Sequence, residues 1–238
     1  MPEKMVVAGI QVAITRKKIK NVHLSVYPPN GVVRMSVPLR MSDETLRVFL
    51  VAKVGWIRSQ QKKLQEAQRE TAREYIDRES HHLWGARLLL KVEEEAAPAN
   101  IEINSRQLIL RIRPGSTSES REAVVHAWYR DQVRAAAEPL ITKWEKKLNV
   151  RANGLFVQKM KTKWGSCNPT KKSIRLNTEL AKKPKECLEY IVVHELVHLL
   201  VPSHNAKFQE LMDTNLPNWR ALRSQLNSSP LAHSDWKY

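Results

Sequence analysis

Residues 185–200 constrain the fold more than any other stretch, because they combine a helical pattern with apolar residues on nearly every side. The sequence KECLEYIVVHELVHLL follows Pro184, a residue that favours the first turn of a helix. A helix that is apolar all round is normally buried, so the pattern predicts a central helix packed against a sheet. Two histidines and a glutamate inside such a helix are costly to bury unless they have partners.

These three polar residues are spaced as a metal site would require. His194 and His198 lie about one helical turn apart on one face, and Glu195 lies beside them. The pattern H-E-x-x-H is the signature of zinc hydrolases in which the glutamate acts as the general base. The alternative is a set of core side chains that satisfy one another by hydrogen bonds.

A catalytic zinc site usually has a third protein ligand and an open position. Pro202 disfavours continuation of the helix and Ser203 can cap a new one, so a turn is expected at residues 200–203. That turn would bring His204 back towards the metal. Glu210 and Asp213, about two turns further along, are the rival third ligands. The other histidines are expected to be surface or core residues: His23, His81, His82, His126 and His233.

The composition favours an ordinary globular protein with a strongly basic surface. The net charge is +16, of which residues 1–150 carry +9 and residues 151–238 carry +7. Such a charge favours encounters with nucleic acid, although a solvated basic surface is the plainer interpretation. The two cysteines, Cys167 and Cys187, are too few for a disulfide framework, which favours a cytoplasmic location. No apolar run approaches the ~20 residues that span a membrane.

The first half of the chain is predicted to be rich in strands. Residues 5–40 read as strands, with a hairpin around a Pro-Pro-Asn-Gly turn, and the apolar N-terminal stretch is expected to be a strand and not a signal peptide. A helix should begin after Ser42 and run into a charged extension at residues 59–74. Residues 82–113 return to strand character.

The second half is predicted to be mainly helical. Ser116 and Glu119 fit a capping box for a helix over about 117–148, which Pro139 should kink or split. Residues 155–180 read as two strands around an Asn-Pro turn, and no internal repeat is visible. The predicted class is α+β, with a β-rich subdomain containing one helix at residues 1–115 and a helical and β domain at residues 116–238.

Several marks around the histidines resemble the YgjP-like family of predicted zinc metallopeptidases. They are a lysine-rich lead into Trp164-Gly165-Ser166-Cys167, then Leu176-Asn177, the H-E-x-x-H motif with His204 and Phe208, and a late Pro217-x-Trp219. The N-terminal hairpin and VAKVGWIRSQ also resemble that family. The metal helix and third histidine are similar, more loosely, to SprT-like proteases that act on DNA-bound proteins.

The resemblance implies a zincin-like peptidase domain with Zn²⁺ at His194, His198 and His204, and Glu195 as the catalytic base. A protein or peptide would then be the substrate, with DNA as a further candidate partner. Strand 173–177 is either an edge strand that pairs with an extended peptide or an ordinary core strand. The segment Trp164–Cys167 is expected to be a tight turn with a close backbone approach. The candidate substrate contacts are Trp164, Arg175 and Asn177, and the candidate oxyanion donors are Tyr190 and Arg175.

Two other functions are compatible with these residues. One is a DNA-binding accessory protein whose metal site is structural, and the other is a zinc hydrolase of a non-peptide amide. An intact Glu195 argues against the structural site, because such a site needs no base.

Overall fold

The computed structural model describes residues 3–27, 31–66, 73–160 and 163–228. The α+β class predicted from the sequence is confirmed. Contacts divide the chain into two compact units, one within Met1–Glu70 and the other within Thr71–Ala232. The boundary expected between residues 115 and 116 falls inside the second unit, because the sheet before it and the long helix after it share one core.

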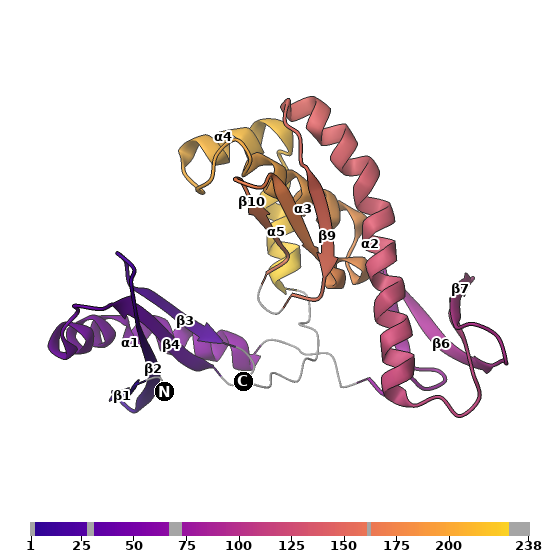
Figure 1. Cartoon of the computed structure of the whole chain (residues 1–238), viewed down its shortest axis with the longest axis horizontal. Helices are drawn as coiled ribbons and strands as arrows, with labels where there is room; N and C mark the ends of the chain where they lie inside the picture. Colours follow the sequence, from indigo (N-terminus) through magenta and orange to yellow (C-terminus); the bar gives the residue numbers. More distant parts are fainter. Residues whose placement is uncertain (1–2, 28–30, 67–72, 161–162, 229–238) are drawn as a thin grey trace. The chain divides into compact units, whose positions relative to one another are not determined.

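The first unit is a four-stranded sheet covered on one face by a helix (Figure 1). Its elements are β1 (Glu3–Val7), β2 (Ile10–Lys17), β3 (His23–Tyr27), β4 (Val32–Pro38) and α1 (Asp43–Glu66). The sheet order is β1-β2-β4-β3, with β2 and β4 parallel and both outer pairs antiparallel. Ser42 Oγ accepts a hydrogen bond from Thr45 N, as a helix-capping residue should. Of the predicted extension over 59–74, the helix includes residues up to Glu66, and residues 67–72 lie outside the described part.

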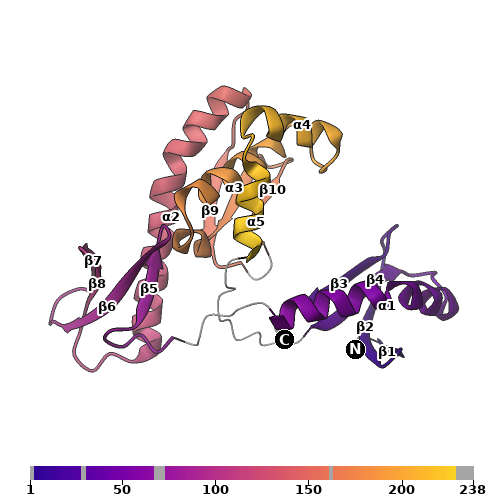
Figure 2. The ribbon, with the colours of Figure 1, turned by 180° about the vertical axis from the view of Figure 1, so that it is seen from behind.

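The second unit begins with another four-stranded sheet and a long helix (Figure 2). These elements are β5 (Ser80–Leu83), β6 (Ala86–Glu94), β7 (Asn100–Asn104), β8 (Gln107–Ile112) and α2 (Ser118–Leu148). α2 packs against β7 and β8 and also against the elements that follow it. It therefore joins this sheet to the histidine-bearing part of the unit.

One detail of α2 differs from the prediction, and of the two effects expected of Pro139, a kink or a split, the split is absent. Thr117, not Ser116, is the N-cap and accepts a hydrogen bond from Ser120 N. Ser116 Oγ instead accepts one from Arg121 Nε. The helix also runs through Pro139 without being split. Pro139 and Ala135, whose carbonyl loses its partner there, are both exposed, so water can hydrate that oxygen.

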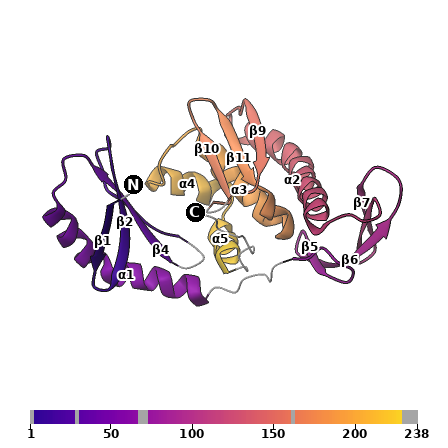
Figure 3. The same ribbon diagram turned by 60° about the horizontal axis from the view of Figure 1, so that its bottom comes forward.

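The histidine-bearing part combines a three-stranded sheet with helices (Figure 3). Its elements are β9 (Gly154–Gln158), β10 (Gly165–Asn168), β11 (Ser173–Asn177), η1 (Thr178–Lys182), α3 (Lys185–Val197), α4 (Ala206–Asn215) and α5 (Trp219–Ser228). The predicted pair of strands around the Asn-Pro turn is confirmed as β10 and β11, but the same stretch also contains a third strand, β9, which the prediction missed. β11 lies between β10, to which it is antiparallel, and β9, to which it is parallel.

This order decides the role of residues 173–177. β11 is the central strand and is largely buried, so the core-strand interpretation is confirmed and the edge-strand interpretation was wrong. β10 lies at the edge instead. α3 is buried along most of its length against the sheet and α2, as its apolar surface predicted.

The two four-stranded sheets have the same topology, although the sequence shows no repeat. The orders β1-β2-β4-β3 and β5-β6-β8-β7 correspond strand by strand, with the same parallel and antiparallel pairs, and each sheet is followed by a helix. The first hairpin of each turns through two residues with positive φ, Ala8-Gly9 and Trp84-Gly85. Positive φ at both central residues is the mark of a type I′ turn.

In the part of the chain that the structure describes, no helix has the length and apolar character needed to cross a membrane.

Candidate active site

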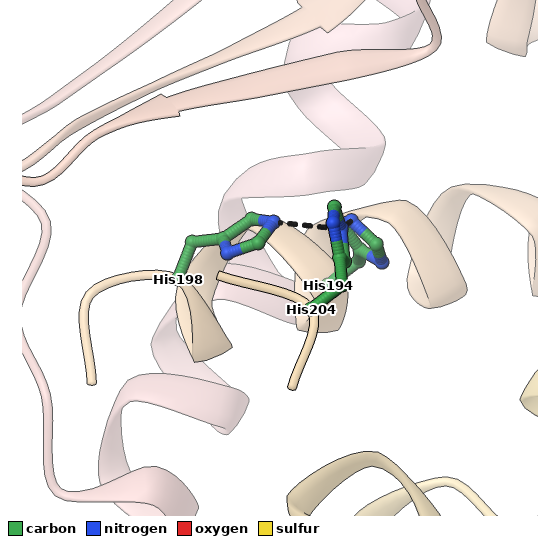
Figure 4. A group of neighbouring side chains, drawn as sticks. All are labelled: His194, His198 and His204. Atoms are coloured by element: carbon green, nitrogen blue, oxygen red, sulfur yellow. Dashed lines mark hydrogen bonds between the residues drawn. The ribbon is translucent and has the colours of Figure 1, made fainter. Parts of the chain in front are cut away.

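Three histidine side chains meet at the end of α3 (Figure 4). His204 Nε2 lies 2.9 Å from His194 Nε2 and 3.1 Å from His198 Nε2. His194 comes from the last turn of α3, His198 caps that helix, and His204 precedes α4. Three ring nitrogens therefore converge on one point, as the H-E-x-x-H spacing and the predicted turn required.

The turn that returns His204 is set by the chain between α3 and α4. Leu199 N and Leu200 N bond to carbonyls three residues back, which tightens the last turn of the helix. Pro202 has no N–H to continue it. Asn205, and not Ser203 as expected, caps α4, because its Oδ1 accepts a hydrogen bond from Phe208 N at 3.0 Å. The predicted break is thus present, with the cap two residues later.

Packing and one hydrogen bond orient the rings. His198 Nδ1 lies 3.1 Å from Val201 O, to which it can donate, and this leaves its Nε2 lone pair directed at the other histidines. The buried Phe208 ring lies 4.7–4.9 Å, between centroids, from all three histidine rings. Phe208 therefore forms the floor of the cluster. His194 Nδ1 is buried without a hydrogen-bond partner among the described residues, so packing and the contact of its Nε2 with His204 hold that ring.

Burial favours the neutral, metal-binding form of His194 and His198. Burial, followed by the neighbouring His198 and His204, lowers the pKa of His194 to about 3. Burial also lowers the pKa of His198. Neutral imidazoles are the ligands that zinc requires, and two nitrogens bound tetrahedrally at 2.0–2.1 Å would lie about 3.4 Å apart. The separations of 2.9 and 3.1 Å are close to that value, so the donor set fits a metal ion.

The rival third ligands lie elsewhere. Asp213 accepts hydrogen bonds from Trp219 Nε1 at 2.7 Å and from the Arg220 guanidinium, so its carboxylate is already engaged. Glu210 is exposed on α4 and is not part of the cluster. Of the three candidates, the structure brings only His204 to His194 and His198.

Glu195 lies beside the cluster and is almost completely buried, with 4% of its surface exposed. Burial raises the pKa of its carboxyl to about 8, against the opposing charge of Lys163. It faces the start of β10. A Cβ atom on Gly165 would lie 2.6 Å from Glu195 Oε1 and 2.8 Å from Ile191 Cγ2, which no structure accommodates without movement.

The segment Trp164–Cys167 is therefore close to another part of the chain, as expected, but most of it is a strand and not a tight turn. The glycine permits contact between β10 and the glutamate of α3. Sequence reasoning missed this role and that of Phe208. For Phe208, the available signal was its position four residues after His204.

The three candidate substrate contacts occupy different positions. The Arg175 guanidinium lies 5.7 Å from the centre of the Phe156 ring. Since side chains alternate along β11, Arg175 lies on the face opposite the buried Ile174 and Leu176. The Trp164 ring packs against the core, with the Lys183 ammonium 5.8 Å from its centre.

Asn177 is buried, and its amide connects the strand to the preceding loop. Its Nδ2 donates to the carbonyls of Met160 and Lys163, both at 2.8 Å. Its Oδ1 accepts from the backbone N–H groups of Met160 and Glu179. Substrate contact by Trp164, Arg175 or Asn177 stays a prediction. Of the candidate oxyanion donors, Tyr190 packs edge-on against His194, with 5.8 Å between ring centres.

Comparison with protein families gives a match that covers most of the chain. The family described as YgjP-like, metallopeptidase domain, matches residues 20–229. The chain belongs to the YgjP-like family. It is a metallopeptidase, as the resemblance of its motifs implied. A search of curated proteins found no match.

Two solved structures are similar to part of this YgjP-like chain. One is the metallopeptidase zymogen abylysin of Pyrococcus abyssi, at 18% identity and a TM-score of 0.36, covering 38% of this chain and 90% of that one. The other is the metallopeptidase zymogen jannalysin of Methanocaldococcus jannaschii, at 23% identity and a TM-score of 0.34, covering 38% and 86%.

Proposed function

We propose that this chain is a zinc-dependent peptidase in which His194, His198 and His204 hold the metal and Glu195 is the general base. The observation that carries this proposal is the convergence of three Nε2 atoms beside a buried carboxylate. Structural zinc sites are usually closed by four protein ligands, whereas catalytic sites have three and an open position. The cluster has three members among the described residues.

Zinc in such a site lowers the pKa of a water ligand to about 7 and polarises a carbonyl group. Glu195 would accept a proton from the attacking water and deliver it to the leaving amine. The positive charge of a zinc ion bound by the histidines would favour the ionised form of the Glu195 carboxyl, which burial alone disfavours. Of the two candidate oxyanion donors, Tyr190 has its ring beside His194, with 5.8 Å between the ring centres.

β10 is the element best placed to bind the substrate backbone. It is the edge strand of its sheet, and Gly165 brings it against Glu195. An extended peptide could pair with the outer edge of β10 by main-chain hydrogen bonds, which would hold it next to the base. This role replaces the one expected for residues 173–177.

Metal content and peptide hydrolysis should be measured for the wild type, Glu195→Gln and His204→Ala. Glu195→Gln should bind zinc as the wild type does and lose hydrolysis, because only the base is removed. His204→Ala should lose most of its zinc. Glu210→Gln and Asp213→Asn are the matched controls and should keep both zinc and activity.

Each alternative predicts a different result. Hydrolysis by Glu195→Gln in a clean preparation would refute the assignment of the base. A wild type that binds zinc without cleaving peptides, but cleaves small amides, would indicate a non-peptide hydrolase. DNA-associated substrates are a narrower hypothesis that the net charge favours, and addition of DNA to the peptide assay tests it.

A further inference from the structure

Asn177, the last residue of β11, makes four hydrogen bonds with its side-chain amide. Only 4% of its surface is exposed. Its Nδ2 donates to the carbonyls of Met160 and Lys163, both at 2.8 Å. Its Oδ1 accepts from the N–H groups of Met160, at 3.3 Å, and Glu179, at 3.1 Å. An asparagine amide has two N–H donors and two acceptor lone pairs, so its whole capacity is used within the chain.

The partners of this amide lie on two different segments. Met160 and Lys163 belong to the connection between β9 and β10, and the backbone N–H of Asn177 adds a bond to the carbonyl of Trp164 at 2.9 Å. Glu179 belongs to η1, whose N-cap is Asn177, and η1 leads into α3. One residue therefore connects the chain that enters β10 to the chain that enters the histidine-bearing helix.

These two segments lead to a single contact between β10 and α3 (Figure 3). The connection held by Asn177 continues directly into Gly165, where an added Cβ would lie 2.6 Å from Glu195 Oε1 and 2.9 Å from its Cγ. Burial raises the pKa of the Glu195 carboxyl and the charge of Lys163 opposes this effect, so Lys163 also lies near the carboxylate. The position of the entry to β10 therefore determines the surroundings of Glu195.

The neighbouring residue provides a comparison within the same stretch. Thr178 is as deeply buried as Asn177, with 5% of its surface exposed, but its Oγ1 has no hydrogen-bond partner among the described residues. Burial at this point of the chain therefore does not by itself give a side chain partners. The four bonds of Asn177 are a specific connection.

We infer that Asn177 is a positioning residue for Glu195, and that its amide fixes the entry to β10 so that the carboxylate keeps its position in the site. This inference rests on the proposed role of Glu195 as the base. Asn177 acts on the rate through the chain that it holds. Such support matters because a displacement of about 1 Å at a reacting group can cost 10²-fold in rate.

Cys167 provides a probe of this connection that requires neither a metal nor activity. It follows Gly165 by two residues on β10, so both lie on the face towards α3. Cys167 is half-buried, and burial, followed by the charge of Glu195, raises its pKa to about 11. Its thiol should therefore react slowly with iodoacetamide while β10 is in place. Cys187, the other cysteine, is fully buried on α3 and reports unfolding of the whole unit.

The full-length wild type, Asn177→Ala and Asn177→Ser should be treated with iodoacetamide, and the modification of each cysteine followed by mass spectrometry. Both variants lose the two bonds that Nδ2 donates. The fraction of molecules in which β10 is released, and with it the alkylation rate of Cys167, should rise about ten-fold. Cys187 should stay unreactive. Asn177→Ser keeps a hydroxyl that can cap η1, so it provides the result if Asn177→Ala does not fold.

Peptide hydrolysis and bound zinc should be measured for the same proteins. In both variants, kcat per bound zinc should fall about ten-fold, because the carboxylate is no longer held in place. Zinc content should match the wild type, because the three histidines come from α3 and the turn after it. The matched control is Thr178→Val, which changes the neighbouring buried side chain without removing a hydrogen bond among the described residues. It should keep the wild-type alkylation rate and kcat.

Three outcomes would overturn the inference. One is an alkylation rate of Cys167 that is the same in the variants as in the wild type, which would show that the amide does not hold β10. Another is alkylation of Cys187 in parallel with Cys167, which would show a general loss of structure. The third is faster alkylation of Cys167 with an unchanged kcat. Failure of the proposed function would be seen separately, as hydrolysis by Glu195→Gln, and would not alter the alkylation rates.

Discussion

Glu195 and Gly165 lie thirty residues apart in sequence, yet each depends on the other in the folded chain. A carboxylate buried in α3 can occupy its position only because the residue facing it on β10 has no side chain. The H-E-x-x-H pattern reveals the two histidines and the glutamate, because their spacing is local. The contact with Gly165 is between a strand and a helix, and no local pattern contains it.

Gly165→Ala should therefore lower kcat while leaving the zinc content unchanged. The new Cβ would lie 2.6 Å from Glu195 Oε1, so the carboxylate must leave the position from which, as the proposed base, it would accept a proton from water. Misplacement by about 1 Å can cost 10²-fold in rate. The measurement is kcat and bound zinc for both proteins.

Gly154→Ala is the control, because its Cβ would lie 3.4 Å from the flexible Phe156 ring of the same sheet. It should keep the wild-type rate. Full activity in Gly165→Ala would show that Glu195 does not need its observed position.

At the scale of the elements, β5, α2 and η1 meet around buried polar groups. His81 is fully buried, with its Nε2 2.8 Å from Glu79 Oε1. Lys182 of η1 lies 2.7 Å from Glu179. The sequence predicts these elements from periodicity, but it assigned His81 only as a surface or core residue. Its charged neighbours come from segments a hundred residues apart, so their meeting depends on the tertiary fold.

This cluster should make the second unit sensitive to acid. Burial and then Arg73 lower the pKa of His81, whereas Glu79 opposes them. Its folded pKa is thus below the unfolded value of about 6.5. As the pH falls below about 6.5, the unfolded state takes up a proton that the folded state does not, and the free energy of unfolding decreases.

Urea unfolding of the wild type and His81→Gln, followed by tryptophan fluorescence at pH 7 and pH 5, measures this effect. The wild type should lose more stability between the two pH values than the variant does. Equal losses would mean that another group is responsible.

Cap positions and the effect of Pro139 belong to the same scale. Ser116 and Thr117 can both cap a helix, so the motif alone cannot distinguish them by one position. The consequence of a proline depends on whether water reaches the carbonyl that it frees. In this helix, Ala135 is exposed, so water can reach its carbonyl, and the helix continues through Pro139.

At the scale of the whole molecule, the two units have separate cores. One contains Leu46 and Leu50 of α1, and the other contains Leu180 of η1 with residues of α2 and α3. Sequence reasoning obtained the α+β class but placed the boundary after the second sheet, because two strand-rich stretches in succession look like one subdomain. The two sheets share a topology but no visible sequence repeat, so no sequence pattern revealed it.

Separate cores predict separate unfolding. Calorimetry should resolve two transitions, since a chain with two domains is not bound to unfold in one step. Leu46→Ala should lower the melting temperature of one transition, and Leu180→Ala that of the other. Both leucines are fully buried, and such changes cost about 2–5 kcal/mol. A shift of both transitions by either variant would show that the units unfold together.

The length of β10 limits how a peptide could be recognised. Only every second residue of an edge strand directs its N–H and C=O away from the sheet, and β10 has four residues. Main-chain hydrogen bonds to β10 would therefore hold only a short segment of the substrate around the cleaved bond. More distant residues of the substrate would not contact this strand. The same brevity protects the protein, because a long open edge is a template for self-association into aggregates. A four-residue strand would thus contact few residues of a peptide substrate, and it also offers little open edge for self-association.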